Sequence, residues 1–238
     1  MADASGTLRT KGEMIRTARQ IGKHTKYMDN NSGQFLKYLM SMYVVVFLAL
    51  AIAPHDRTTW FVENLTVWII LAVIIGLYRI GIHCSRTAYS LMFILIYLHT
   101  IGGHYTFALV PFDWITNFFG FSRNHFDRIA HFSVGFYAFA IAEWLWIKRL
   151  VNNKFLLFTY PVFVIATIAM SYELVEWIYA DLSDPAAGAA YLGSQGDIWD
   201  AQKDMLADTL GAILATALFF LLRNPFNKLP AERKRTLK

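Results

Sequence analysis

The residues of this sequence that could do chemistry are ionisable side chains placed inside apolar stretches. They come in groups spaced three or four residues apart: Asp127 and His131; Glu173 and Glu176; Asp200, Asp204 and Asp208. Residues at this spacing share one face of a helix, so each group presents its polar atoms together. Charged groups at membrane depth are costly, and those that persist there commonly mark a functional site. The candidate catalytic residues are therefore Asp127, His131, Glu173, Glu176, Asp204 and Asp208.

Three kinds of chemistry suit these residue types. Carboxylates that lie close together need a cation, an arginine or protons to compensate them. One interpretation is a divalent metal ion with an open position for water, and its hypothetical ligands are His99, His104, His131 and Glu173. A second is a metal-free site in which Asp127 orients His131 as a general base. A third is a proton or ion path.

Basic residues near these groups would complete a binding site. Arg123 or Arg128 could neutralise the carboxylates or hold a lipid phosphate group. Together with Gln195 and Asp200 they form the candidate substrate-binding set.

Each group also has a purely structural interpretation. Asp127 and His131 could be a helix cap and an interface histidine, and Asp197 or Asp200 could cap the last helix. Glu143, near the opposite end of its stretch, is explained by snorkelling or by pairing with Lys148. The whole cluster could be a hydrogen-bonded bundle core without chemistry.

The composition indicates the scaffold that must hold these groups. The chain has 238 residues, of which 56% are hydrophobic and 16% charged. Soluble domains carry roughly 25% charged residues, and the 7 Trp, 12 Tyr and 19 Phe suit membrane interfaces. The single cysteine, Cys84, excludes an internal disulfide. The sequence therefore predicts an all-α, polytopic membrane protein.

Six stretches approach the roughly 20 apolar residues that a spanning helix needs. They are residues 36–53, 60–78, 88–105, 126–147, 155–179 and 205–222. The predicted transmembrane domain is thus 36–222, between a basic cytoplasmic segment, 1–35, and a basic cytoplasmic tail, 223–238. The first segment is either an amphipathic helix on an anionic leaflet or a mobile tail.

The distribution of basic residues predicts the orientation. With the N-terminus in the cytoplasm, 18 of the 22 Lys and Arg fall on cytoplasmic segments and four on the outer side. This is the positive-inside pattern, so we expect both termini inside and the polar groups in the outer half. Because the net charge of +5 is explained by topology, nucleic-acid binding is not expected.

Three runs of sequence carry a family resemblance. They are 126–132 (Phe-Asp-Arg-Ile-Ala-His-Phe), 172–177 (Tyr-Glu-Leu-Val-Glu-Trp) and 193–205 (Gly-Ser-Gln-Gly-Asp-Ile-Trp-Asp-Ala-Gln-Lys-Asp-Met). The chain resembles the YjdF-type inner-membrane proteins of bacteria over about residues 36–222, and it is more distantly similar to the VanZ-like membrane proteins. The resemblance implies a multi-pass location in the inner membrane and makes the polar set the functional centre. It does not supply an activity.

The leading functional hypothesis is a membrane protein that acts on or binds a lipid or envelope precursor at the outer leaflet. A small ion-coupled transporter is the first alternative, although it predicts polar residues in the cytoplasmic half, where only Glu143 offers one. A non-catalytic membrane scaffold is the second. The pattern predicts no oligomeric state.

Overall fold

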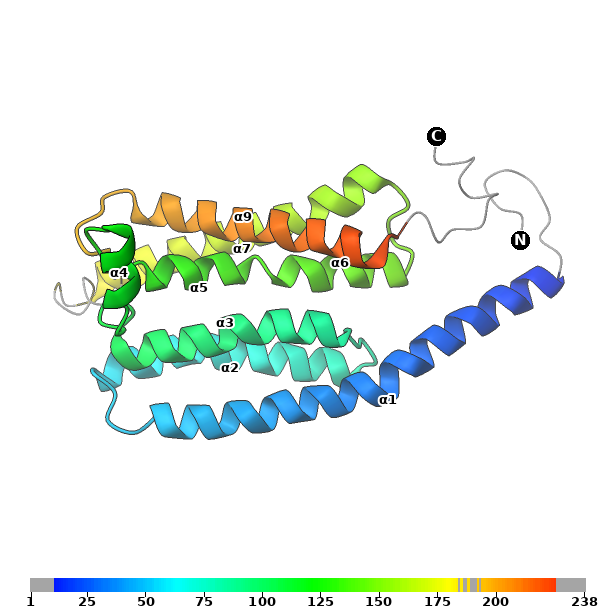
Figure 1. Cartoon of the computed structure of the whole chain (residues 1–238), viewed down its shortest axis with the longest axis horizontal. Coiled ribbons are helices and arrows are strands. Elements are labelled where there is room, and N and C mark those ends of the chain that lie inside the picture. Colours follow the sequence, from blue (N-terminus) through cyan, green and yellow to red (C-terminus); the bar gives the residue numbers. More distant parts are fainter. Residues whose placement is uncertain (1–10, 184, 186–187, 189–191, 193, 226–238) are drawn as a thin grey trace.

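The computed structural model describes residues 11–183, 185, 188, 192 and 194–225, with the backbone alone for residues 11–30. The described residues form helices and no strand, which confirms the predicted all-α class. The long helices run side by side along one axis (Figure 1). They are α1 (Lys11–Leu50), α2 (Arg57–Arg79), α3 (Arg86–Tyr105), α4 (Asp113–Phe119), α5 (Phe126–Val134), α6 (Tyr137–Ile147), α7 (Lys154–Leu182) and α9 (Asp200–Arg223).

Five segments of these helices are long and apolar enough to cross a membrane. They are Asn31–Leu50, Arg57–Arg79, Phe126–Ile147, Lys154–Leu182 and Asp200–Arg223. The sixth predicted span corresponds to α3, which is long enough at 20 residues but is not among these five segments. It contacts α1, α2, α5 and α6, so protein rather than lipid surrounds much of it. A helix in that position can carry polar residues. The count of six spans stays a prediction, with which the structure is compatible.

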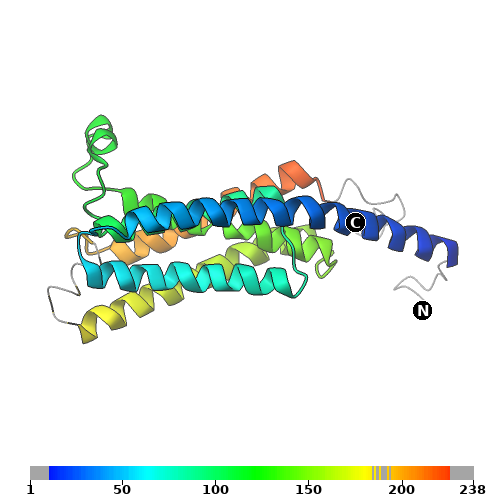
Figure 2. The same ribbon diagram turned by 90° about the horizontal axis from the view of Figure 1, so that it is seen from below.

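The predicted boundary at residue 35 falls inside a helix. The backbone of α1 continues without a break from Lys11 to Leu50, and its first part extends past the bundle (Figure 2). The N-terminal segment and the first span therefore form one element from Lys11 onward. Residues 1–10 and the tail beyond residue 225 lie outside the described residues.

The predicted span 126–147 is two helices rather than one. The break between α5 and α6 lies at Gly135, where a Cβ atom would meet the backbone of α9 at Asp208, Gly211 and Ala212. On the other side of this contact, a Cβ on Gly211 would meet the carbonyl oxygen of Phe132. Small residues let membrane helices approach closely. The two glycines thus bring α5 directly against α9, the two helices that carry most of the candidate site.

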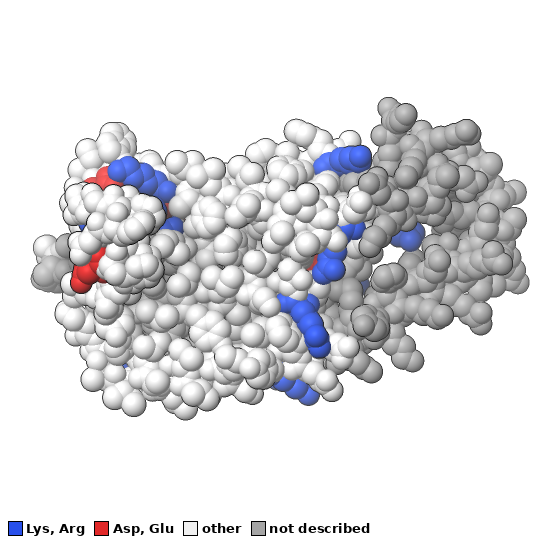
Figure 3. All heavy atoms as spheres, in the orientation of Figure 1, with Lys and Arg blue, Asp and Glu red and all other residues white. Residues whose placement is uncertain are grey.

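The charged residues separate toward the two ends of the bundle. At one end, Arg79 ends α2, Arg86 begins α3, Lys154 begins α7 and Arg223 ends α9. The visible face carries basic side chains near this end, and acidic side chains together with basic ones at the other (Figure 3). The short helix α4 stands off the bundle at that second end (Figures 1 and 2). This separation agrees with the charge pattern from which the orientation is predicted.

Substituting alanine for Gly211 should destabilise the bundle, because the new Cβ would meet the backbone of α5 at Phe132. Overpacking of this kind costs about 1–3 kcal/mol, which a lower midpoint of thermal unfolding in detergent would report. The matched control is Gly76→Ala in α2, where a Cβ would meet nothing within 4 Å. Equal midpoints for the two variants would contradict the close approach of α5 and α9.

Cysteine labelling tests the orientation. Burial raises the pKa of the native Cys84 thiol to about 12, and Cys84→Ser removes it from the experiment. In that background, Trp114→Cys on α4 and Leu150→Cys after α6 each place a thiol at an exposed position, at opposite ends of the bundle. We expect a membrane-impermeant maleimide to label Trp114→Cys in intact cells and Leu150→Cys only after lysis. The reverse pattern would mean that the polar end faces the cytoplasm.

Candidate functional site

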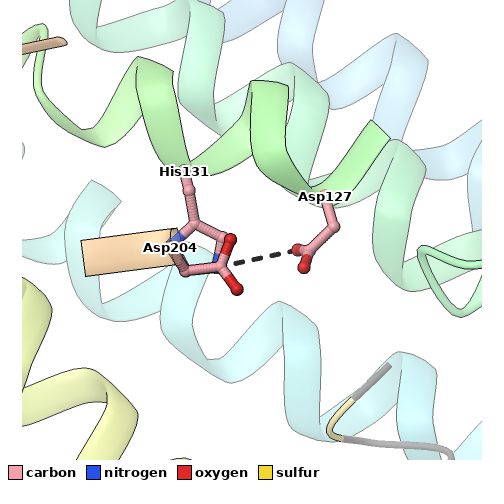
Figure 4. A group of neighbouring side chains, drawn as sticks. All are labelled: Asp127, His131 and Asp204. Carbon is pink, nitrogen blue, oxygen red and sulfur yellow. Dashed lines mark ion pairs between the residues drawn. The ribbon is translucent and has the colours of Figure 1, made fainter. Parts of the chain in front are cut away.

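Three of the predicted site residues meet between α5 and α9. Asp127 and His131 come from α5 and Asp204 comes from α9, and one ligand atom of each lies within 4.8 Å of the others (Figure 4). His131 Nε2 is 3.6 Å from Asp127 Oδ1 and 3.9 Å from Asp204 Oδ1. The spacing of four residues on each helix therefore does place these polar atoms on facing surfaces.

A fourth predicted residue orients the histidine. His131 Nδ1 lies 3.3 Å from Asp208 Oδ2, and the Asp208 side chain is 2% exposed. When Nδ1 carries the proton and donates to Asp208, Nε2 presents its lone pair toward Asp127 and Asp204. Histidine ligands of metal ions are commonly held in this way by a carboxylate.

Both predicted arginines are engaged with the start of α9. Arg128 donates to the carboxylates of Asp200 and Asp204 and, at 3.0 Å, to the carbonyl oxygen of Asp200. Arg123 Nη1 donates to Asp200 Oδ1 at 2.6 Å and to the carbonyl oxygen of Ser194 at 2.9 Å. These contacts fit the predicted neutralising role. Arg123 Nη2 is buried without a hydrogen-bond partner in the described part of the chain.

The charges of this network do not balance. Its carboxylates are those of Asp127, Asp197, Asp200, Asp204 and Asp208, and its permanent cations are Arg123, Arg128 and Lys203. With a neutral His131, two formal negative charges are left over. A hydrogen bond from Lys203 lowers the pKa of Asp197, so that this carboxylate is ionised at neutral pH. With all five carboxylates ionised, the site would therefore need a bound cation or additional protons to compensate its charge.

An amide pair ties the loop before α9 to the start of α5. Gln195 Nε2 donates to the carbonyl oxygen of Asn124 at 2.9 Å, and the Asn124 N–H donates to Gln195 Oε1 at 3.1 Å. Asn124 Oδ1 also accepts from the Phe126 N–H, while its Nδ2 donates to the carbonyl oxygens of Ala108 and Val110. Sequence reasoning did not select Asn124, although an asparagine just before a helix is a capping signal.

Asp127, His131, Asp204 and Asp208 together form the His131 cluster. A cavity of about 110 Å³ opens beside it, among α2, α3, α5, α7 and α9. The carboxylates and imidazoles in its lining belong to Glu63, His99, Asp127, His131, Glu176 and Asp208, and Thr66 and Tyr172 add hydroxyl groups. Among the described residues that line it, none is Lys or Arg. Glu63 was not among the predicted site residues, yet it carries the same signal as the others, since it is a carboxylate inside an apolar stretch.

The structure does not gather the hypothetical metal ligands His99, His104, His131 and Glu173. His104 Nδ1 lies 2.7 Å from the carbonyl oxygen of Leu50, and His99 Nε2 lies 3.0 Å from Glu63 Oε2. Glu173 is buried, with Oε1 lacking a hydrogen-bond partner in the described part of the chain. The reason is geometric, because His99 and His104 are five residues apart on α3 and so point in different directions.

Two predictions of structural roles are wrong. The residue before α9 is Trp199, which makes no side-chain cap, and Asp200 is held by the arginines instead. Asp197 Oδ1 accepts from the Trp199 N–H at 3.1 Å, but Asp197 is not the capping residue. Glu143 pairs not with Lys148 but with Arg223 Nη2 at 2.7 Å, and it accepts from the Ser85 N–H at 2.9 Å. Here α9 packs against α6, and the basic residue at its last turn reaches the carboxylate.

Comparison with known proteins agrees with this architecture. Residues 35–225 match the family model described as "Predicted membrane protein (DUF2238)". The chain belongs to this family. It is also 32% identical over 186 residues to the inner membrane protein YjdF of Escherichia coli strain K12, covering 75% of this chain and 85% of that protein. No solved structure matches.

These findings confirm the resemblance to YjdF-type proteins and the multi-pass location in the inner membrane. A lipid environment follows for the apolar helices. The more distant similarity to VanZ-like proteins stays a prediction.

Replacing Arg128 by Gln should destabilise the helix bundle of this protein, because Asp200 and Asp204 lose a shared counter-ion. Removing one partner of a buried ion pair costs about 3 kcal/mol, which thermal unfolding in detergent would measure. The control is Arg57→Gln, since Arg57 donates at an exposed position to the carbonyl oxygen of Ala51. If Arg128→Gln unfolds at the wild-type temperature, Arg128 does not hold the two helices together.

Proposed function

We propose that this protein is an outward-facing, metal-dependent membrane enzyme that acts on a lipid or envelope precursor at the outer leaflet. The observation that carries the proposal is the convergence of Asp127, His131 and Asp204, whose ligand atoms lie within 4.8 Å of one another beside a cavity.

The distances suit a metal ion. Ligand atoms about 2.1 Å from a tetrahedral ion lie about 3.4 Å from one another. His131 Nε2 is 3.6 Å from Asp127 Oδ1 and 3.9 Å from Asp204 Oδ1, so small side-chain shifts would complete the site. Mixed imidazole and carboxylate ligands favour Zn²⁺ or Mn²⁺. Three protein ligands would leave the remaining position open to water or substrate.

Other residues of the chain have roles that follow from their contacts. A bound divalent ion supplies a nucleophilic hydroxide near neutral pH and polarises an ester or phosphoryl oxygen. Asp208 would hold the His131 ring in position. Glu176 lines the cavity from α7 and is outside the proposed ligand set, so it is the candidate for transferring protons to or from a bound substrate.

The surroundings of the site favour an amphiphilic substrate. The cavity also has apolar walls, to which Ile70, Leu95, Val134 and Ile168 contribute. Arg123 Nη2, near the start of α9, is a buried donor available to an anionic head group. A site of this kind can take an apolar chain and a polar group together.

The described core argues against the transporter alternative. On α9, Ala212, Ala215 and Phe219 follow Asp208 toward the cytoplasmic end, and all three are buried in an apolar cluster. Beyond them, Glu143 is already paired with Arg223. A carrier needs a polar path through the membrane, and these residues offer no continuation of the outer site.

Metal analysis tests the proposal. Purified protein equilibrated with Mn²⁺ or Zn²⁺ and then desalted should retain at least one ion per chain by elemental analysis. Asp127→Asn and His131→Gln should each lower that number by about one, because each removes a ligand. Asp113→Asn on α4, which removes an exposed carboxylate, serves as the matched control and should leave the number unchanged.

If wild type and Asp127→Asn retain the same amount of metal, the metal-dependent function is wrong. The cluster would then be a structural core, as the scaffold alternative holds.

A further inference from the structure

We infer that the short helix α4 inserts its aromatic side into the lipid leaflet at the end of the bundle that holds the His131 cluster. The partner is membrane lipid, bound through apolar and aromatic contact rather than through charge. This inference goes beyond the proposed function and does not depend on a bound metal ion.

The seven residues of α4 form an amphipathic helix. At about 100° per residue, its apolar and polar side chains separate onto two sides. The apolar side carries Trp114, Ile115, Phe118 and Phe119, and the polar side carries Asp113, Thr116 and Asn117. The apolar arc is about 140° wide. Trp114 lies at the edge of this arc, so a thiol at that position stays within reach of water.

The described part of the chain does not cover the apolar side of α4. No residue of this helix is buried. Trp114 is 73% exposed, Phe118 is 81% exposed and Phe119 is 62% exposed. Adjoining exposed apolar side chains of this size mark an interaction surface. The apolar side of α4 therefore requires a partner.

The position of α4 indicates that the partner is lipid. The candidate spans Phe126–Ile147 and Asp200–Arg223 begin at this end of the bundle, and Lys154–Leu182 ends there, so a membrane–water boundary lies at this level. Figure 2 shows α4 displaced sideways from the axis of the bundle rather than continuing it. A helix beside the bundle at this level lies over the surrounding lipid. The exposed apolar surface of the spans begins there too, at Ile129 in the first turn of α5.

The composition of α4 agrees with an interfacial position. Tryptophan and phenylalanine are common on the apolar side of helices that lie in the membrane interface. Asp113 is the only charged residue of α4, and none of its residues is Lys or Arg. The helix therefore has no means of selecting anionic lipids. Lipid surrounds the bundle at this level in any case, so no second protein is needed to cover the aromatic side.

The segment that carries α4 is fixed to the start of α5. Asn124 Nδ2 donates to two carbonyl oxygens of the loop before α4, at distances of 3.1 and 2.8 Å. The ring of Phe112, just before α4, packs edge to face against Phe126, with centroids 5.6 Å apart. Phe126 is the first residue of α5 and precedes Asp127. Insertion of α4 would thus hold the start of α5 at a fixed height relative to the membrane surface.

Spin labelling of the full-length chain tests the inference. In the Cys84→Ser background, a nitroxide is attached at Phe118→Cys on the apolar side or, as the matched control, at Asn117→Cys on the polar side, both exposed positions. The protein is reconstituted into phosphatidylcholine vesicles. Collisions of the label are measured with oxygen, which concentrates in lipid, and with a water-soluble nickel chelate present on both sides of the membrane.

We expect the label at Phe118→Cys to collide several-fold less often with the chelate, and more often with oxygen, than the label at Asn117→Cys. The same result is expected when phosphatidylglycerol is added, because α4 has no basic residue. Gel filtration establishes that each labelled variant is folded, and Phe119→Cys gives a second position on the apolar side.

Three results would overturn the inference. Equal collision with the chelate at both positions would mean that α4 lies in water. Low collision with both reagents at Phe118→Cys would mean that its aromatic side packs against protein, and spectral broadening that is lost on dilution with unlabelled chain would identify that protein as a second copy. Insertion that occurs only with phosphatidylglycerol would mean that charge, and not apolar contact, holds the helix.

Discussion

The contact between α5 and α9 is the constraint on which the rest of the site depends. Gly135 and Gly211 have no side chains, so the two backbones meet where any Cβ would collide. Only at this separation can the His131 ring reach Asp204 and Asp208 of the opposite helix, and only then can Arg128 span Asp200 and Asp204. In a membrane, where apolar side chains gain little by leaving lipid, such close packing and interhelical polar contacts are what hold helices together.

The same contact concentrates negative charge. The aspartates of α9 face α5 because their spacing of four residues keeps them on one helical face, and α5 adds Asp127 to them. Two arginines and one lysine compensate three of the five carboxylates. A state with excess buried charge is less stable than one in which a cation is bound. Anything that binds the folded chain and not the unfolded one stabilises it, so an ion bound as proposed would couple metal content to stability.

Periodicity and topology predicted the helices and the members of the His131 cluster, because a helix fixes which of its residues share a face. They could not say which faces of separate helices meet. His99 and His104 both lie on α3, yet His99 faces Glu63 and His104 faces the end of α1. Glu63 was missed for the same reason, since its relation to His99 exists only after α2 packs on α3. The break at Gly135 likewise depends on α9 and leaves no mark in the local hydrophobic pattern.

Buried carboxylates have different partners at the two ends of the bundle. At the end where α9 finishes, Glu143 is 2% exposed and both its oxygens are satisfied, one by Arg223 and the other by the Ser85 N–H. Glu143 therefore shows that other residues of the chain can fully compensate a buried carboxylate. At the end that holds His131, Asp208 Oδ1 is buried without a hydrogen-bond partner in the described residues, and Glu63 Oε2 lies 3.0 Å from a histidine, His99, rather than from an arginine or lysine. A bundle core built only for packing would be expected to satisfy both ends alike, and the excess of carboxylates at one end is the feature that the proposed metal-dependent function accounts for.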